Sequence, residues 1–287
     1  MIAVELETIP PAVLPADRFP MNAWTDPTTG CRLAYDDTGS GPPVVLIHAF
    51  PLCREMWAPQ RGAVSKSSRL LTPDVFGFGD SELPADGWTM DGFADTLAAW
   101  LAGIGVAGPV VMGGLSMGGY VALAFARRHP ELVKGLILAD TRADPDTAET
   151  KAKRDETITF VEQNSAAAQI EKMLPAMLCQ NTREHRPDVV AEVTRMGSAQ
   201  SVPGVVAALR ALRDRPDSTA SLSGFHFPTM VIVGREDTIT PPALAAAMVE
   251  KLPDATELPL YGAGHLSNLE ADVAFNRALV GWLEAIA

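Results

Sequence analysis

Short apolar runs rich in β-branched residues alternate along the chain with longer stretches in which apolar positions recur at helical spacing. Residues 31–36 alternate between polar and apolar and end at a Gly/Pro-rich turn, which predicts an antiparallel strand. The other runs predict strands at 44–48, 69–74, 110–112, 136–139, 230–233 and 256–260. The helical stretches are 53–65, 91–103, 117–129, 241–251 and 271–286. This order is typical of an α/β fold, in which helices cover both faces of a largely parallel sheet.

The pattern changes between residues 144 and 224, where strand-like runs vanish and helix-period stretches are separated by prolines. This segment holds ten basic and twelve acidic residues, so its net charge is only −2. An ordinary crossover between parallel strands needs roughly 10–20 residues, and this segment is far longer. We therefore predict a helical cap (lid) at 144–224, inserted into a core made of residues 1–143 and 225–287.

The composition indicates a globular protein, with 47% hydrophobic and 20% charged residues among 287. The three cysteines, Cys31, Cys53 and Cys179, are far apart and odd in number, which favours free thiols in a reducing compartment. The first eleven residues contain acidic residues and prolines instead of a signal peptide's basic and apolar regions. No apolar run reaches the roughly 18 residues that a membrane span requires. We expect a cytoplasmic protein that does not associate with membranes.

The formal net charge of −12 argues against binding to nucleic acid, because phosphate binding needs clustered Lys and Arg. The sequence has no H-E-x-x-H pattern or Cys/His cluster, so we expect no metal site. It also lacks the phosphate-loop and dinucleotide-binding glycine patterns, so we expect no cofactor. The sequence does not specify the oligomeric state.

The segment Gly113–Gly119 carries the strongest chemical signal. It places Ser116 in a G-x-S-x-G pattern between an apolar run and a helical stretch, which predicts a strand, a sharp turn and a helix. Small residues at 114 and 118 would let strand and helix approach closely while the serine takes a strained conformation. A tight turn without chemistry would also fit the five-residue pattern alone. A nucleophilic serine needs a base and a group that orients the base.

Two residues after later strands can supply these partners. Asp237 follows the strand at 230–233, with Glu236 and Asp140 as competing acids, although an Asp there is also common as a helix cap. Of the five histidines, His265 alone is both downstream and in a loop at a strand's carboxyl end. The order Ser116, Asp237, His265 is the one expected for a hydrolase triad. In it, His265 would take the serine proton and Asp237 would fix the imidazole tautomer.

From about residue 22 onward the chain resembles the α/β-hydrolase family. The matching segments are His48–Pro51, Asp74–Ser81, the serine turn, Gly234–Asp237 and Gly262–His265. The resemblance implies a mostly parallel, eight-stranded sheet, an oxyanion hole formed by the backbone N–H groups of Phe50 and Met117, and a loop-ordering role for His48. The family usually has His-Gly where this chain has His48-Ala49. If the loop requires a positive φ there, alanine would be strained.

Within that family the chain is most similar to small capped esterases and lactonases, including 3-oxoadipate enol-lactonases and haloperoxidase-type esterases. This implies a serine carboxylesterase acting on small acyl or aromatic esters, and the alternative is an enol-lactonase. A more remote alternative is a non-catalytic receptor or interaction protein on the same fold. Serine at the turn argues against epoxide hydrolases and haloalkane dehalogenases, which need aspartate. C–C bond hydrolases, acyltransferases and hydroxynitrile lyases also fit a serine turn.

Substrate contacts are expected from Trp57, Met173 and Met177, although the apolar face of the cap also fits simple packing on the core. An enol-lactone that bears a carboxylate would need an inward-facing arginine. The candidates for that role are Arg142, Arg183, Arg186 and Arg195.

Overall fold

A computed structural model describes residues 21–287 of the chain, and in these residues eight strands form one sheet. The strands are β1 (Asn22–Thr25), β2 (Arg32–Thr38), β3 (Pro43–Ile47), β4 (Arg69–Pro73), β5 (Val110–Leu115), β6 (Val133–Ala139), β7 (Thr229–Gly234) and β8 (Ala255–Leu260). Their order across the sheet is β1-β2-β4-β3-β5-β6-β7-β8. Only β2 is antiparallel to both its neighbours, β1 and β4, and the remaining pairs are parallel. The predicted mostly parallel, eight-stranded sheet is confirmed.

Helices connect these strands in the alternating order that the sequence predicts. In residues 21–287 they are η1 (Arg54–Trp57), α1 (Ala58–Val64), α2 (Met90–Gly103), α3 (Met117–Arg128), η2 (Pro130–Leu132), α4 (Ala148–Gln163), α5 (Ala166–Met177), α6 (Gln180–His185), α7 (Pro187–Ser198), α8 (Val202–Arg213), η3 (Thr219–Gly224), α9 (Pro242–Val249), α10 (Ser267–Glu270) and α11 (Asp272–Ala285). The predicted helix at 53–65 starts as the 3₁₀ turn η1 before α1, and the short α10 precedes α11.

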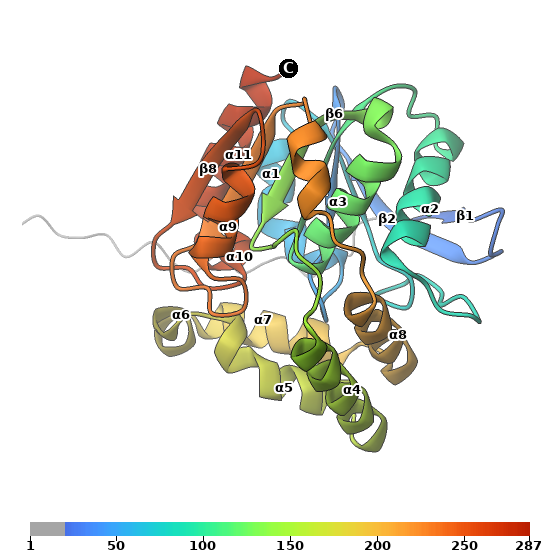
Figure 1. The fold of residues 1–287 in the computed structure, drawn as a ribbon, viewed down its shortest axis with the longest axis vertical. Coiled ribbons are helices and arrows are strands. Elements are labelled where there is room, and N and C mark those ends of the chain that lie inside the picture. The colour runs from blue at the N-terminus through green and yellow to red at the C-terminus, as the bar shows by residue number, and fades with distance from the viewer. Residues whose placement is uncertain (1–20) are drawn as a thin grey trace, which may run out of the picture.

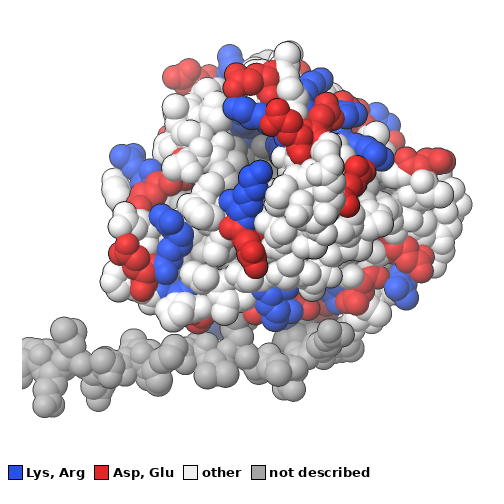
Figure 2. All heavy atoms as spheres, turned by 90° about the horizontal axis from the view of Figure 1, so that it is seen from below, with Lys and Arg blue, Asp and Glu red and all other residues white. Residues whose placement is uncertain are grey.

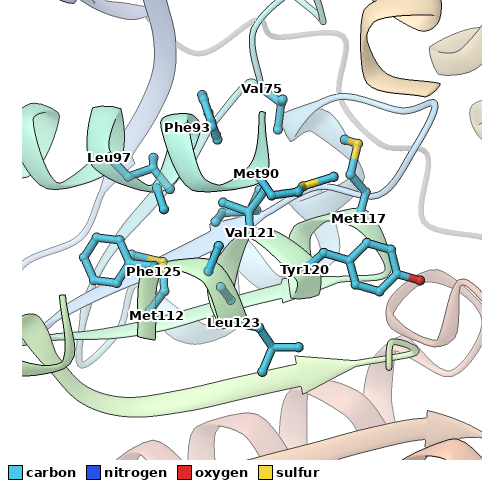
Figure 3. Close-up of a cluster of buried hydrophobic side chains, with 14 of the residues drawn as sticks. Val75, Met90, Phe93, Leu97, Met112, Met117, Tyr120, Val121, Leu123 and Phe125 are labelled. Carbon is cyan, nitrogen blue, oxygen red and sulfur yellow. The ribbon is translucent and has the colours of Figure 1, made fainter. Parts of the chain in front are cut away.

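The sheet lies between two layers of helices (Figure 1). Alternate residues of β3 face opposite sides, so Val45 and Ile47 belong to the apolar layer that contains α2, α3 and α9, while Val44 and Leu46 belong to the layer that contains α1 and α11. Figure 3 shows the first layer, where Met90, Phe93 and Leu97 of α2 meet the side chains of α3. Each large apolar side chain buried in this way contributes about 1.5–3 kcal/mol. The two layers hold the carboxyl ends of the central strands at one edge.

The segment between β6 and β7 contains α4–α8 and η3, and α4–α8 lie together at that edge, at the bottom of Figure 1. Its local sequence explains where these helices begin. The side chains of Thr147, Ser165 and Ser201 accept backbone N–H groups at the starts of α4, α5 and α8. Pro187 and Pro203 lie in the first turns of α7 and α8, where a missing N–H costs little. Pro187 and Pro203 therefore mark the starts of helices, whereas Pro175 lies inside α5.

No helix in residues 21–287 has the length and apolar composition needed to cross a membrane. The prediction of a cytoplasmic protein depends on the N-terminal segment, which lies outside the described residues. The start of the predicted core at 1–143 also lies outside them.

Candidate active site

Ser116 occupies the sharp turn between β5 and α3. Its φ of 55° and ψ of −110° are rare for a residue with a side chain, and among the described non-glycine residues only Asp140 (φ 43°) shares a positive φ. Such a conformation costs about 1–3 kcal/mol and needs support from its surroundings. The Ser116 N–H donates to the Ala139 carbonyl at 2.9 Å, and the Thr141 hydroxyl donates to the Ser116 carbonyl at 2.9 Å. The end of β6 therefore holds the strained turn in place.

Two glycines let α3 approach the sheet closely at this turn. A Cβ atom on Gly114 would lie 2.3 Å from the carbonyl carbon of Gly118. A Cβ atom on Gly118 would lie 2.0 Å from the Ile47 carbonyl oxygen. Both distances are too short for any side chain, so the close packing expected from the G-x-S-x-G pattern is present.

The structure brings Ser116, His265 and Asp237 together in a chain of hydrogen bonds. His265 Nε2 lies 2.8 Å from Ser116 Oγ, and His265 Nδ1 lies 2.8 Å from Asp237 Oδ2. The Asp237 carboxylate also accepts the Ile239 and Thr240 N–H groups at 2.8 and 3.0 Å, and the Thr240 hydroxyl at 2.6 Å. All three side chains are buried, at the carboxyl ends of β5, β8 and β7 respectively. This geometry suits a serine hydroxyl activated by an oriented base.

The charges around His265 favour a stable imidazolium. Burial acts to lower the pKa of His265, but the Asp237 charge and hydrogen bond, with smaller effects of Asp140 and Glu270, raise the pKa above its usual value near 6.5. Burial acts to raise the pKa of Asp237, yet the charge and hydrogen bond of His265 and the bonds from Thr240 hold it below the usual value. The Asp237 carboxylate is therefore ionised and stabilises a protonated His265.

The two competing acids lie elsewhere. Glu236 is exposed on the surface. Asp140 is fully buried, but its carboxylate accepts the Gly234 N–H at 2.7 Å and the Ser267 hydroxyl. Burial, followed by the nearby Asp237 charge, raises the pKa of Asp140 to about 8. Asp140 therefore ties the end of β7 and the start of α10 to the end of β6, and Asp237 is the acid that contacts the imidazole.

The loop after β3 places Phe50 beside this turn. Phe50 and Met117 are buried, and neither backbone N–H donates a hydrogen bond to another group within residues 21–287. Ala49 is not among the described residues with positive φ, so the concern that alanine would be strained there was wrong. The loop turns through a bond from the Leu52 N–H to the Ala49 carbonyl at 2.9 Å, which any residue can make at position 49.

His48 orders this loop, as expected from the family resemblance. The Val75 N–H donates to His48 Nε2 at 2.9 Å, so the ring proton is on Nδ1 and donates to the Ala49 carbonyl at 3.0 Å. Burial lowers the pKa of His48 to about 4, which keeps the ring neutral. The ring joins the loops after β3 and β4 and does not contact Ser116.

A buried ion cluster beneath the same loop was not foreseen from the sequence. The Arg54 guanidinium pairs with Asp36 at 3.0 Å, with Asp80 at 2.8 Å and with Asp74, and the Arg54 N–H donates to Asp74 at 2.8 Å. Burial raises the pKa of Asp74 to about 6, although Arg54 opposes the shift. A Cβ atom on Gly79 would overlap the Asp74 carboxylate, which explains the glycine there. The cluster fixes the start of η1, directly after the loop that carries Phe50.

Glu270, in α10, holds the loop that carries His265. Its carboxylate accepts the N–H groups on both sides of the histidine, from Gly264 at 2.8 Å and Leu266 at 3.3 Å. It also accepts the Cys179 N–H at 2.7 Å, and the His265 N–H donates to the Met177 carbonyl at 3.1 Å. Residues 177–179 between α5 and α6 are thus bonded to the histidine loop. No sequence pattern distinguishes Glu270 from an ordinary helical glutamate.

Two of the three residues expected to contact substrate have no accessible surface. The Trp57 ring is fully buried with its centroid 6.2 Å from that of Phe275 in α11, and Met177 is fully buried among the apolar side chains of the same layer. The expectation that they contact substrate is therefore wrong in this structure, because packing covers both side chains. Met173 is partly exposed and contacts both apolar layers, and its role stays a prediction.

One of the four candidate arginines faces a cavity beside the site. A cavity of about 290 Å³ is lined by Tyr120, Arg142, Ile239, Thr240 and residues of α4. Arg186 and Arg195 instead pair with Asp188 and Glu192 at the surface, and Arg183 is exposed. Acidic and basic side chains are interspersed over the face that α4–α8 present to solvent (Figure 2). Among the described residues, no group of His, Cys, Asp and Glu could hold a metal ion.

Comparison with protein families shows which family has this fold and these residues. The model of the alpha/beta hydrolase fold matches residues 42–272, most of the chain and all three residues of the hydrogen-bonded chain. The chain belongs to the α/β-hydrolase fold family. The recognition made from the motifs is thereby confirmed, and the hydrolases among its relatives support a hydrolase.

Three similar proteins illustrate the range of this α/β-hydrolase group. A thermophilic esterase from Thermogutta terrifontis, solved with malate bound, is 38% identical with a TM-score of 0.90, covering 93% of this chain and 99% of its own. The enol-lactonase from Burkholderia xenovorans LB400 is 26% identical with a TM-score of 0.84, covering 92% and 100%. A 2-hydroxymuconate semialdehyde hydrolase from Pseudomonas sp. strain CF600 is 28% identical over 267 residues, 88% of this chain and 90% of its own.

Proposed function

We propose that this chain is a serine carboxylesterase that cleaves small acyl or aromatic esters. The observation that carries the proposal is the chain of 2.8 Å contacts from Ser116 through His265 to Asp237. The similarity to an esterase at 38% identity over nearly the whole of both chains supports it. The substrate is then a small molecule, and the nucleophile comes from the chain itself.

In the proposed reaction Ser116 Oγ attacks the ester carbonyl carbon while His265 Nε2 takes the hydroxyl proton. The electron pair of the carbonyl moves to its oxygen, which would accept the N–H groups of Phe50 and Met117, each worth about 3 kcal/mol in such sites. When the tetrahedral intermediate collapses, His265 gives its proton to the leaving alcohol. Water, deprotonated by His265, then attacks the acyl-enzyme and releases the acid. Asp237 keeps the His265 proton on Nδ1 throughout.

The helices of residues 144–224 act in this proposal as the cap over the site, and residues 1–143 and 225–287 act as the core. Two features support this division. The helices lie at the edge of the sheet where the strands that carry Ser116, Asp237 and His265 end (Figure 1). Residues of α4 also line the cavity that reaches Thr240, whose hydroxyl bonds to Asp237.

A fluorophosphonate probe tests the mechanism directly. We expect one covalent adduct, which peptide mass spectrometry places on Ser116, because the oriented His265 makes this hydroxyl far more nucleophilic than an ordinary serine. His265→Gln should form the same adduct much more slowly. An unlabelled protein, or an adduct on a different residue, would overturn the proposed nucleophile and favour a non-catalytic role on this fold.

The second candidate function is hydrolysis of an enol-lactone. It is supported by the similarity to an enol-lactonase that extends over 92% of this chain. A panel of p-nitrophenyl esters and a 3-oxoadipate enol-lactone separates the two functions. For a carboxylesterase we expect the highest kcat/KM with a simple ester. A kcat/KM for the lactone far above that of every ester would replace the first proposal with the second.

A further inference from the structure

The cavity beside Ser116 has a cationic lining in a chain whose net charge is −12. Its charged lining residues are three cations, Arg142, Lys153 and Arg154, and one carboxylate, Asp146. A surplus of positive charge beside a reaction site raises the local concentration of anionic ligands.

The surplus rests on Arg142, because Lys153 pairs with Glu149 at 2.7 Å and Arg154 pairs with Asp146. Asp146 does not pair closely with Arg142. Its carboxylate, almost completely buried, is already bound by Arg154 at 3.0 Å and by Arg215, behind the cavity wall, at 2.5 Å. Arg142 lies farther away, at 3.7 Å from Asp146. The remaining contacts of Arg142 are the Pro145 carbonyl at 3.2 Å and the half-exposed Asp144 at 3.3 Å. The Arg142 Nε is buried and has no hydrogen-bond partner in the part of the chain that the structure describes.

An unpaired buried N–H of a guanidinium is costly unless a ligand accepts it. The guanidinium group offers parallel N–H donors in a geometry that matches a carboxylate. Arg142 therefore has the charge and the planar donor group that a carboxylate would use.

The cavity is connected to the candidate nucleophile through three of its neighbours. Arg142 directly follows Thr141, whose hydroxyl supports the Ser116 carbonyl. Tyr120 lies one helical turn after Ser116, and its hydroxyl points away from the apolar cluster around it (Figure 3). Thr240 also lines the cavity, with its hydroxyl 3.3 Å from His265 Nδ1. A ligand in the cavity is therefore held next to the residues that perform the proposed reaction.

We propose that this cavity binds a carboxylate of the substrate, with Arg142 as its main partner. The inference rests on the proposed serine mechanism and adds the substrate class: esters or lactones that carry a carboxylate besides the bond that is cleaved. Their product would be a dicarboxylic acid or a hydroxy or oxo acid.

Two matched substrate pairs test this class on the wild-type protein. The first pair, 4-acetoxybenzoate and its methyl ester, places the charge in the alcohol part. The second, mono-p-nitrophenyl adipate and p-nitrophenyl hexanoate, places it in the acyl part. We expect kcat/KM to favour the anion at least about tenfold in one pair, as a charged hydrogen bond in a partly buried site provides. Sodium chloride at about 0.5 M should reduce that preference, since the guanidinium of Arg142 is partly exposed to solvent.

Variants identify the residue responsible. Arg142→Gln should reduce the anion-to-neutral ratio of kcat/KM at least about tenfold, and Arg142→Lys, which keeps the charge, should restore part of it. Arg186→Gln is the matched control, because it removes an arginine paired with Asp188 at the surface, and it should keep the wild-type ratio.

The outcomes separate the two proposals. Neutral esters hydrolysed through Ser116 without an anion preference in either pair would overturn the carboxylate site alone, as would a preference that Arg142→Gln leaves unchanged. Failure to hydrolyse all four esters, together with no fluorophosphonate adduct, would overturn the serine mechanism itself.

Discussion

Replacing Ser116 with alanine is expected to lower kcat for esters by about 10⁶-fold, the loss typical when the nucleophile of such a triad is removed. The variant should fold, because the contacts that hold the turn are made by the backbone N–H and carbonyl of residue 116. Ester hydrolysis by purified protein, with active-site titration to exclude contaminating enzyme, measures the loss. Activity within about tenfold of wild type would assign the nucleophile elsewhere.

Ser116→Gly is the matched control for this variant. Both substitutions remove the hydroxyl, but alanine keeps the cost of a φ of 55° whereas glycine adopts that angle freely. The relief of about 1–3 kcal/mol is partly offset by the greater flexibility of glycine in the unfolded chain. The free energy of unfolding of Ser116→Gly should therefore exceed that of Ser116→Ala by about 1 kcal/mol. Equal stabilities would mean that the strain at residue 116 does not exceed the entropic cost of glycine, about 1 kcal/mol.

Asp237→Asn is expected to lower kcat by about 10⁴-fold while the protein stays folded. An amide at this position can no longer fix the His265 proton on Nδ1 or stabilise the imidazolium that forms when Ser116 attacks. Glu236→Gln, the same chemical change one residue earlier at an exposed side chain, should retain wild-type kinetics. Near-wild-type turnover in Asp237→Asn would transfer the acid role to Asp140, another carboxyl group near His265.

The same variant should shift the pH profile. Protonated His265 cannot accept the serine proton, so kcat/KM falls as the pH drops through the His265 pKa, which Asp237 holds above 6.5. Removing the Asp237 charge should move the acidic limb of the residual activity to lower pH. Asp140 and Glu270 also raise this pKa, so the limb should move without vanishing. An acidic limb at the same pH in both proteins would exclude Asp237 as the partner of the base.

Most of the sheet could be predicted from the sequence, and so could Ser116, Asp237 and His265, because each strand and each of these residues stands in a recognisable local pattern. Buried parallel strands are apolar runs in the sequence. The close approach of strand and helix at Gly114 and Gly118 requires glycines, which the G-x-S-x-G pattern contains. The strand β1 was missed because it is four residues long, at the sheet edge, with alternate residues exposed.

The expectations that were wrong depend on which neighbouring residues cover a given side chain. Trp57 and Met177 are apolar residues near the site in sequence, but tertiary packing against α11 and its layer determines that both are buried. The ion cluster of Arg54 joins four residues from separate loops and strands, and Glu270 acts through backbone groups of distant segments. The spacing of apolar and polar residues along one sequence does not indicate such contacts. Of the four candidate arginines, only packing shows that Arg142 faces the cavity.

The bonds of Glu270 constrain how a substrate can reach Ser116. The connection between α5 and α6 is joined to the histidine loop through Glu270 and the Cys179 N–H, through the Met177 carbonyl, and through the Cys179 thiol and the Gly262 carbonyl at 3.4 Å. Opening the site at this connection would move His265 away from Ser116, so a substrate that entered there would meet a serine without its base.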